Sequence, residues 1–270
     1  MVYQGKRSRR RKGRINLAVL GIVGVLCVSV VVLRHMVCSA DAGTAPETEV
    51  TIPQYSGLAP MEVKVQVPTD GSIVPESEPV ENDYFSSAVF LGDSRTEGFH
   101  LYSGLREGTC LYATGATVET VFSKPVWQGP SGKKEPLLKI LSHLQPERVY
   151  IMLGVNELGW VKSEAFYNQY AKVVDQVRAD NPDAKIFLQS IMPVTAKKDA
   201  QKSYVNNQRI KEYNELILKL AKEKKCWYVD VVSAVQDNDG CLRADFATDG
   251  VHLNRPGCQA WLHYLRTHAI

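Results

Sequence analysis

The sequence predicts an α/β domain in which a parallel sheet of five strands is covered by helices. Short apolar runs alternate with longer helical stretches from Tyr84 onward, and this alternation is typical of parallel sheets. The apolar runs are expected to be strands and cover Ala88–Leu91, Cys110–Ala113, Val149–Leu153, Ile186–Ser190 and Trp227–Val232. The helical stretches cover Pro136–Leu144, Glu164–Ala179, Val205–Lys224 and Pro256–His268.

Two of these helices carry an apolar stripe that predicts packing against the sheet. In the helix 164–179 the stripe consists of Phe166, Tyr170, Val173, Val174 and Val177. In the helix 205–224 it consists of Ile210, Tyr213, Ile217, Leu218 and Leu220. Five strands with intervening helices indicate a flavodoxin-like three-layer α/β/α sandwich, in which the first and third strands are central neighbours and a ligand crevice lies at their carboxyl ends.

The first 83 residues fall outside this pattern. Residues 1–14 hold seven Lys or Arg and no acidic residue, which predicts a basic cytoplasmic tail. Residues 15–33 carry no charge and Arg34 follows them, and a helix of that length spans roughly 28 Å, enough for a bilayer core. We therefore expect residues 15–34 to be a transmembrane anchor with the N-terminus in the cytoplasm. The alternative is a signal peptide cleaved near Ala42.

Residues 35–83 are rich in Pro, Glu, Ser and Thr, and residues 41–83 contain nine acidic residues and one lysine. This composition predicts a disordered extracytoplasmic stalk before the domain 84–270. The domain itself has 23 basic and 20 acidic residues. Once the N-terminal tail is assigned to the membrane, no nucleic-acid partner is indicated.

The first strand leads into Gly92-Asp93-Ser94, where the chain is expected to turn tightly and open a helix. Helix N-terminal N–H groups stabilise a nearby anion, so Ser94 is well placed to be a nucleophile, although a serine here is also an ordinary helix cap. A serine nucleophile needs a base. Asp249 and His252 near the C-terminus supply an acid and an imidazole three residues apart, and Asp245 is the competing acid.

Two further segments end apolar runs with groups that can donate hydrogen bonds, namely the N–H of Gly115 and the amide of Asn156. The four segments, in this order, resemble the blocks of the SGNH (GDSL-like) hydrolases over about residues 85–270. The matching positions are Gly92, Asp93 and Ser94, then Gly115, then Gly154, Asn156 and Glu157, then Asp249 and His252. Turn formation is the alternative explanation of Gly115 and Asn156.

The resemblance implies a Ser94–His252–Asp249 triad and an oxyanion hole made by the N–H groups of Ser94 and Gly115 with the amide of Asn156. It implies no cofactor and no metal. Gly92, Asp93, Gly154 and Glu157 are expected to support the loops. Arg95 is expected to pair with Glu97 or Glu157, or to bind an anionic substrate.

Other residues remain candidates on weaker grounds. Cys241 and Cys258 bracket the segment that carries Asp249 and His252, and a disulfide between them would pin it, whereas Cys110 and Cys226 are expected at opposite edges of the sheet. No C-x-x-C spacing indicates zinc. Trp127 and Trp160 are equally well explained as pocket walls or as packing. Flavin binding is disfavoured because acidic side chains in the first loop repel phosphate.

The function expected from these features is an extracytoplasmic serine esterase, an acylhydrolase or deacetylase that acts through an acyl-enzyme. Location outside the membrane favours O-acyl groups of cell-envelope carbohydrate as the substrate, with lipid as another class of ester. The alternatives are a non-catalytic glycan-binding module on the same fold and an acyltransferase that uses the same site.

Overall fold

The computed structural model describes residues 73–270. The predicted basic tail, the predicted anchor and most of the predicted stalk lie outside these residues. Every helix within residues 73–270 is too short or too polar to cross a bilayer.

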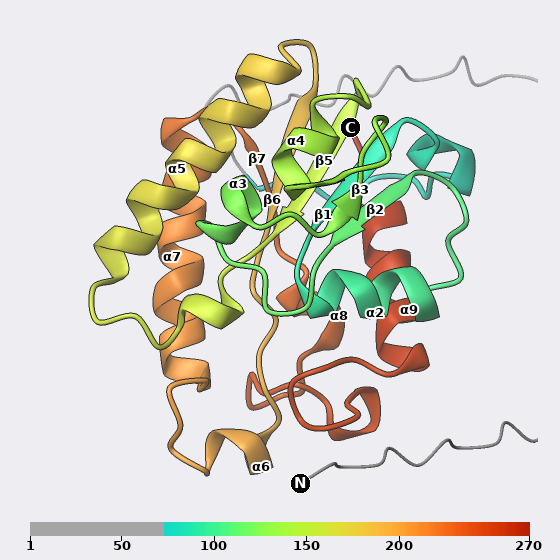
Figure 1. Ribbon diagram of the computed structural model, residues 1–270. Helices are drawn as coiled ribbons and strands as arrows, with labels where there is room; N and C mark the ends of the chain where they lie inside the picture. The colour runs from blue at the N-terminus through green and yellow to red at the C-terminus, as the bar shows by residue number, and fades with distance from the viewer. Residues whose placement is uncertain (1–72) are drawn as a thin grey trace, which may run out of the picture. The chain divides into compact units, whose positions relative to one another are not determined.

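Five parallel strands form the central sheet in the order β2-β1-β5-β6-β7 (Figure 1). Their bounds are β1 Ala88–Gly92, β2 Thr109–Tyr112, β5 Arg148–Met152, β6 Lys185–Gln189 and β7 Trp227–Val229. The predicted fold class is confirmed, because β1 and β5 are central neighbours and the other strands flank them. A short antiparallel pair that was not predicted, β3 and β4, lies outside this sheet and covers Trp127–Gln128 and Lys134–Glu135.

Side chains of the central strands alternate between two hydrophobic clusters, which gives three layers. Along β5, Val149 and Ile151 join one cluster, and Tyr150 and Met152 join the other. Helices α3 (Thr120–Ser123), α4 (Leu137–Leu141), α5 (Ser163–Asp180) and α7 (Asn207–Glu223) contribute to the first cluster. Helices α2 (Ser94–Tyr102), α8 (Val232–Val235) and α9 (Arg255–Arg266) contribute to the second.

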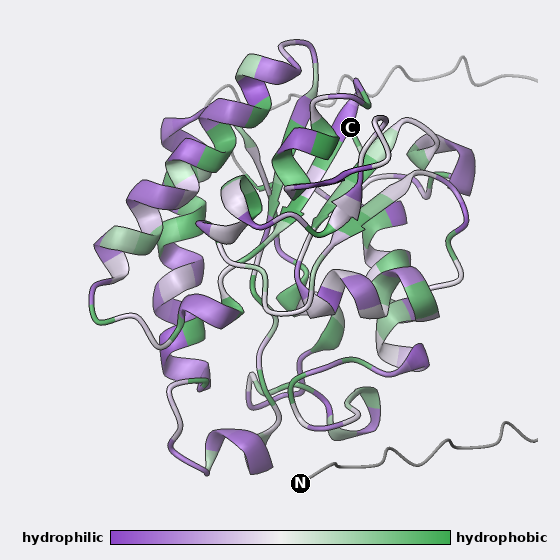
Figure 2. Cartoon of the chain, viewed as in Figure 1, coloured by the Kyte–Doolittle hydropathy of each residue, from purple (hydrophilic) through white to green (hydrophobic). Residues whose placement is uncertain are grey.

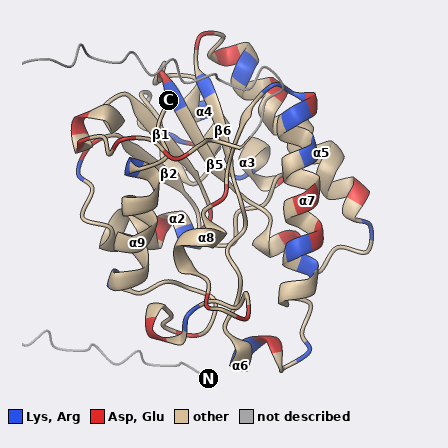
Figure 3. Cartoon of the chain, turned by 180° about the vertical axis from the view of Figure 1, so that it is seen from behind, with Lys and Arg blue, Asp and Glu red and all other residues tan. Residues whose placement is uncertain are grey.

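The surface pattern follows from these layers. Figure 2 shows hydrophobic residues gathered on the strands, with hydrophilic residues on the outward parts of the helices. Acidic and basic residues are interspersed along α5 and α7 (Figure 3). Charge of both signs therefore covers this outer helical layer.

Several element ends differ from the predicted ones for local reasons. Helix α7 begins at Asn207 and not at Val205, because the Asn206 side chain caps it by accepting a hydrogen bond from the Arg209 N–H. Strand β7 ends at Val229 and not at residue 232, because the backbone turns there and the Val231 N–H donates to the Val229 carbonyl. Helix α4 ends at Leu141, three residues earlier than predicted.

Residues 73–83 pack on the domain, so the predicted domain boundary at residue 84 lies inside a packed segment. Ile73 forms a parallel bridge with Tyr228 of β7, and Val74 is buried. The Val80 N–H donates to the Arg266 carbonyl at 2.9 Å. A 3₁₀-helix, η2 (Asn82–Phe85), then leads into β1. The edge of β7 and the end of α9 therefore hold the chain before it enters the sheet.

Gly92, the last residue of β1, gives a direct test of the packing at the carboxyl end of the sheet. An added Cβ at Gly92 would lie 2.1 Å from Thr96 Oγ1 and 2.6 Å from the Met152 carbonyl oxygen. We expect Gly92→Ala to lower the free energy of unfolding by about 1–3 kcal/mol, the usual cost of overpacking. The shift in the urea unfolding midpoint measures it.

Gly98 is the matched control. It lies within α2, and the nearest atom that its Cβ would meet is Cys258 Sγ at 4.0 Å. Gly98→Ala should stabilise the protein by up to about 1 kcal/mol, because alanine is the better helix former. Equal midpoints for the two variants would contradict the close approach of β1 and β5 at Gly92.

Candidate active site

Ser94 lies where β1 ends and α2 begins, at the carboxyl edge of the sheet. It is the first residue of α2, and Asp93 caps the helix by accepting a 2.8 Å hydrogen bond from the Arg95 N–H. Within residues 73–270 the Ser94 N–H has no hydrogen-bond partner, as expected for the first turn of a helix. Ser94 therefore presents a hydroxyl and a free N–H at the same end of the helix.

The structure brings Ser94, His252 and Asp249 together. Ser94 Oγ lies 2.8 Å from His252 Nε2, and His252 Nδ1 lies 2.8 Å from Asp249 Oδ2. When Nδ1 carries the proton and donates a hydrogen bond to Asp249, Nε2 is the basic nitrogen that faces the serine. This is the geometry that a serine nucleophile, its base and an orienting acid require.

Asp249 is held by its own turn as well as by the imidazole. Its Oδ1 accepts hydrogen bonds from the N–H groups of Val251 and His252, at 2.9 and 2.8 Å. Burial opposes ionisation of Asp249, but the hydrogen bonds from the His252 backbone and ring and from Val251 prevail and lower its pKa to about 2. Asp249 is therefore ionised at neutral pH. The competing acid, Asp245, pairs with Arg243 instead.

The segment after β6 fixes the position of this turn. The Thr195 N–H donates to the Gly250 carbonyl at 3.0 Å. Gly250 has a φ of +89°, and an added Cβ would lie 2.8 Å from Thr195 Oγ1. Both the backbone conformation and the close contact with Thr195 therefore require glycine at this place.

Two asparagines of α7 in turn fix the segment after β6. Asn214 Oδ1 and Nδ2 bind the N–H and the carbonyl of Ile191, at 2.7 and 2.9 Å. Asn207 binds the N–H and the carbonyl of Val194 in the same way, at 2.8 and 3.0 Å. The seven-residue spacing puts both amides on one face of the helix. These two asparagines were not predicted from the sequence. Their seven-residue spacing on one helix was the signal that could have indicated them.

The predicted oxyanion donors lie after the neighbouring strands. Gly115 is exposed in the turn after β2 with a φ of +73°, and its N–H has no partner among the described residues. Asn156 lies in the 3₁₀-helix η3 (Val155–Glu157) after β5. Its Nδ2 donates to the Ala116 carbonyl at 2.8 Å and makes a longer contact of 3.4 Å with Asp93 Oδ2. The longer contact is the weaker of the two hydrogen bonds.

The predicted pairing of Arg95 is wrong. Arg95 is 3% exposed, and its Nη1 donates to the Met192 carbonyl at 2.8 Å. Burial lowers the pKa of its guanidinium, and the charges of Asp93 and Asp249 oppose that effect. Helix α2 directs this side chain inward, and Arg95 pairs with neither predicted glutamate. Glu97 instead accepts a hydrogen bond from Thr114.

The remaining supporting residues have structural explanations. Gly154 has a φ of +128°, and an added Cβ would lie 2.5 Å from Ile191 Cδ1. Trp127 donates from Nε1 to the Tyr112 carbonyl and packs edge-on against the Tyr112 ring. Trp160 is partly buried against the core. Both tryptophans therefore pack on neighbouring elements, which is the plainer of the two predicted roles.

The predicted disulfide is not formed, because Cys241 and Cys258 are both free. Cys258 is fully buried within α9, and its Sγ faces Gly98 of α2. Cys241 Sγ lies 3.3 Å from Asn207 Nδ2 on α7. The two thiols therefore point to different neighbouring helices. The segment between the two cysteines, which carries Asp249 and His252, is held by backbone hydrogen bonds and by the asparagines of α7.

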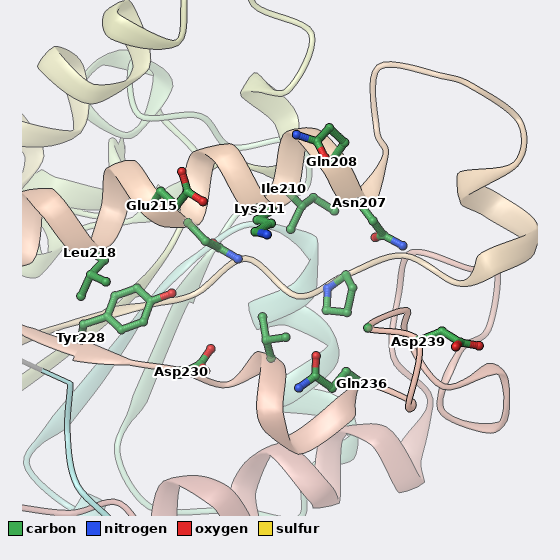
Figure 4. A pocket seen from close by; sticks show the side chains of 14 residues that line it. Asn207, Gln208, Ile210, Lys211, Glu215, Leu218, Tyr228, Asp230, Gln236 and Asp239 are labelled. Carbon is green, nitrogen blue, oxygen red and sulfur yellow. The ribbon is translucent and has the colours of Figure 1, made fainter.

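One cavity in the described part of the chain is lined by none of Ser94, Asp249 and His252. It has a volume of about 530 Å³ and lies between α7 and the end of β7. Figure 4 shows side chains of Lys211 and Leu218 from α7 facing those of Tyr228, Asp230 and Gln236. Asn207 and Asn214, which hold the segment after β6, are among its lining residues. Within residues 73–270 no group of three or more His, Cys, Asp or Glu is arranged to hold a metal ion.

Comparison with known proteins identifies a family for this chain. The model of the GDSL-like lipase/acylhydrolase family matches residues 90–260. The curated proteins contain no match. A protein from Streptococcus pneumonia named for platelet activating factor superposes with a TM-score of 0.54 at 23% identity, covering 69% of this chain and 82% of that chain.

Two other solved structures share the fold. One is from Parabacteroides merdae and is named as a GDSL-like lipase, with a TM-score of 0.52, 17% identity and coverage of 71% of this chain and 96% of that chain. The other is Axe2, an acetylxylan esterase from Geobacillus stearothermophilus, with a TM-score of 0.50, 17% identity and coverage of 68% and 94%. Because the family match spans more than half of the sequence, the chain belongs to the GDSL-like lipase/acylhydrolase family and is a carboxylic ester hydrolase.

Proposed function

We propose that this ester hydrolase acts through Ser94 as nucleophile, His252 as general base and Asp249 as the acid that orients the imidazole. The observation that supports these roles is the pair of 2.8 Å contacts, Ser94 Oγ to His252 Nε2 and His252 Nδ1 to Asp249 Oδ2. Ionised Asp249 stabilises the positive imidazolium that forms when the serine proton moves to His252.

The reaction then has two steps, acylation of Ser94 and hydrolysis of the acyl-enzyme. Ser94 Oγ attacks the ester carbonyl carbon as its proton passes to His252 Nε2, and the tetrahedral intermediate collapses as the leaving alcohol takes that proton. Water attacks the acyl-enzyme with His252 again as the base, which releases the acid and restores Ser94. The N–H groups of Ser94 and Gly115 and the amide of Asn156 are the donors proposed for the oxyanion.

The substrate that we propose is an O-acyl group of cell-envelope carbohydrate. The proposal depends on the predicted location, because the uncharged segment 15–33 and the basic tail before it favour a domain outside the membrane. The acetylxylan esterase among the similar structures is compatible with it, but a likeness at that level of identity concerns the fold.

The catalytic proposal is tested by p-nitrophenyl acetate hydrolysis with the full-length chain in detergent. We expect Ser94→Ala to lower kcat by about 10³-fold or more, since the variant lacks the nucleophile. Ser142→Ala, which removes an exposed hydroxyl after α4 that bonds only to the Lys139 carbonyl, should retain the parent rate. Full activity in Ser94→Ala would contradict the assignment.

The substrate is tested with O-acetylated peptidoglycan and O-acetylated polysaccharide. Free acetate should appear with the parent chain and not with Ser94→Ala. Transfer of the acetyl group to an added sugar, in place of free acetate, would indicate an acyltransferase. A glycan-binding module would bind these polymers and release acetate from none of them. Turnover of p-nitrophenyl acetate without acetate release from either polymer would contradict a carbohydrate substrate.

We also propose that residues 15–34 anchor the chain with the domain outside the membrane. Protease added to intact cells should remove a tag fused to the C-terminus, because the domain is then accessible, and should leave a tag at the N-terminus intact. A C-terminal tag that is degraded only after lysis would contradict this orientation. Release of the tagged domain into the medium would favour cleavage near Ala42.

A further inference from the structure

The turn after β2 carries one of the proposed oxyanion donors, so its position matters for catalysis. We call residues 113–118 the oxyanion loop. The Ala113 N–H donates to the Gly92 carbonyl at 3.2 Å, and the Ala116 N–H closes the turn on the Ala113 carbonyl at 2.9 Å. An added Cβ at Gly115 would meet no atom within 4 Å. The exposed tip of the loop has little packing of its own, so other contacts must fix it.

Two adjacent residues of η3 hold the distal half of the oxyanion loop. Asn156 Nδ2 donates to the Ala116 carbonyl at 2.8 Å. Glu157 Oε1 accepts from the Val118 N–H at 2.6 Å. Because β1 lies between β2 and β5 in the sheet, these contacts cross the end of the strand that leads to Ser94. Strand β5 thereby fixes the loop after β2 relative to the proposed nucleophile.

Glu157 makes its contact from a fully buried position. The residue is 0% exposed, and Oε2 is buried without a hydrogen-bond partner among the described residues. A buried carboxylate with a single backbone donor is poorly stabilised. A neutral carboxyl group suits the place better, because Oε1 then accepts from Val118 as a carbonyl oxygen and Oε2 carries the proton.

The charged surroundings also favour the neutral carboxyl group. The titratable groups near it are Asp93 after β1 and Glu119 before α3, with Tyr170 of α5 and Tyr213 of α7. The Tyr213 hydroxyl donates to the Glu157 backbone carbonyl and not to the side chain. Burial, with Asp93 and Glu119, outweighs the Val118 hydrogen bond and raises the pKa of Glu157 to about 8.

We propose that Glu157 is a positioning residue that holds the oxyanion loop through Val118 in its neutral form, so that ester hydrolysis weakens when its carboxyl group ionises. The inference depends on the proposed serine mechanism and extends it to the control of the oxyanion hole by pH. Ionisation leaves the buried Oε2 charged and without a hydrogen-bond donor, so the side chain moves towards solvent or another donor. Either movement releases the Val118 N–H and shifts Gly115.

The kinetic test compares Glu157→Gln with Glu157→Asp in the full-length chain. Glutamine has the same shape, is neutral and keeps a carbonyl oxygen for Val118, so kcat at pH 7 should stay within about threefold of the parent. Aspartate is one methylene shorter and loses the contact, so kcat should fall by about 10- to 100-fold with little change in KM, as expected for a misplaced transition-state donor. Parent kcat in Glu157→Asp would overturn the proposal.

The pH profile separates positioning from simple packing. The parent should lose kcat as the pH rises through about 8, and Glu157→Gln should lack that alkaline decline. Glu164→Gln, a change at an exposed acid in the first turn of α5, is the control and should keep it. An alkaline decline that is identical in the parent and in Glu157→Gln would overturn the proposal.

A melting experiment tests protonation without using the reaction. The folded-state pKa is raised from 4.5 to about 8, so the folded form binds the proton more tightly than the unfolded chain. Stability from Glu157 is therefore present below about pH 4.5 and is lost as the pH rises to about 8. The Tm of the parent should fall across this window relative to that of Glu157→Gln.

The same melting comparison in a Ser94→Ala background separates the state of Glu157 from the serine mechanism. The Tm of Ser94→Ala should fall across this pH window relative to that of the double variant Ser94→Ala/Glu157→Gln. The same pH dependence in both chains would show that the carboxyl group of Glu157 is not held neutral, and would overturn the inference. If Ser94→Ala retains esterase activity, the serine mechanism fails, whereas the melting result still decides the protonation state.

Discussion

The parallel pairing of β1 with β5 is the constraint on which the rest of the site depends. Gly92 pairs with Met152 at the end of the register, and the absence of a Cβ at Gly92 allows this close approach. The two strands therefore end side by side. Ser94 and Asn156 follow those ends within a few residues, which places the proposed nucleophile and an oxyanion donor at the same edge of the sheet. Helix α2 can then begin at Ser94 with its first N–H group free.

His252, the proposed base, comes from a distant part of the chain. A series of hydrogen bonds to the backbone positions it at this edge of the sheet. Asn207 and Asn214 hold the segment after β6, and Thr195 in that segment holds Gly250. The turn with His252 is thereby fixed relative to the sheet without a disulfide. The oxyanion loop is fixed in the same manner from η3. Rigid strands and helices thus position each loop that carries a proposed catalytic group.

The strands, the long helices and the four blocks of the site were predictable, because apolar runs and short motifs are local signals. The contacts between segments far apart in the sequence, which hold the site in place, were not predictable. Arg95 was expected to pair with Glu97 or Glu157, or to bind an anionic substrate, yet helix α2 buries it against the Met192 carbonyl. The expected bridge between Cys241 and Cys258 overlooked that α9 directs one thiol into the core. Orientation about a helix axis decides both cases, and sequence spacing alone does not supply it.

The proposed mechanism requires that His252 activates Ser94 as the nucleophile. The most direct measurement is mass spectrometry of the full-length chain after reaction with a fluorophosphonate. We expect one adduct, located on Ser94, and a rate of labelling that falls strongly in His252→Ala because the serine loses its base. An adduct on another residue, or equal labelling of Ser94 with and without His252, would contradict it.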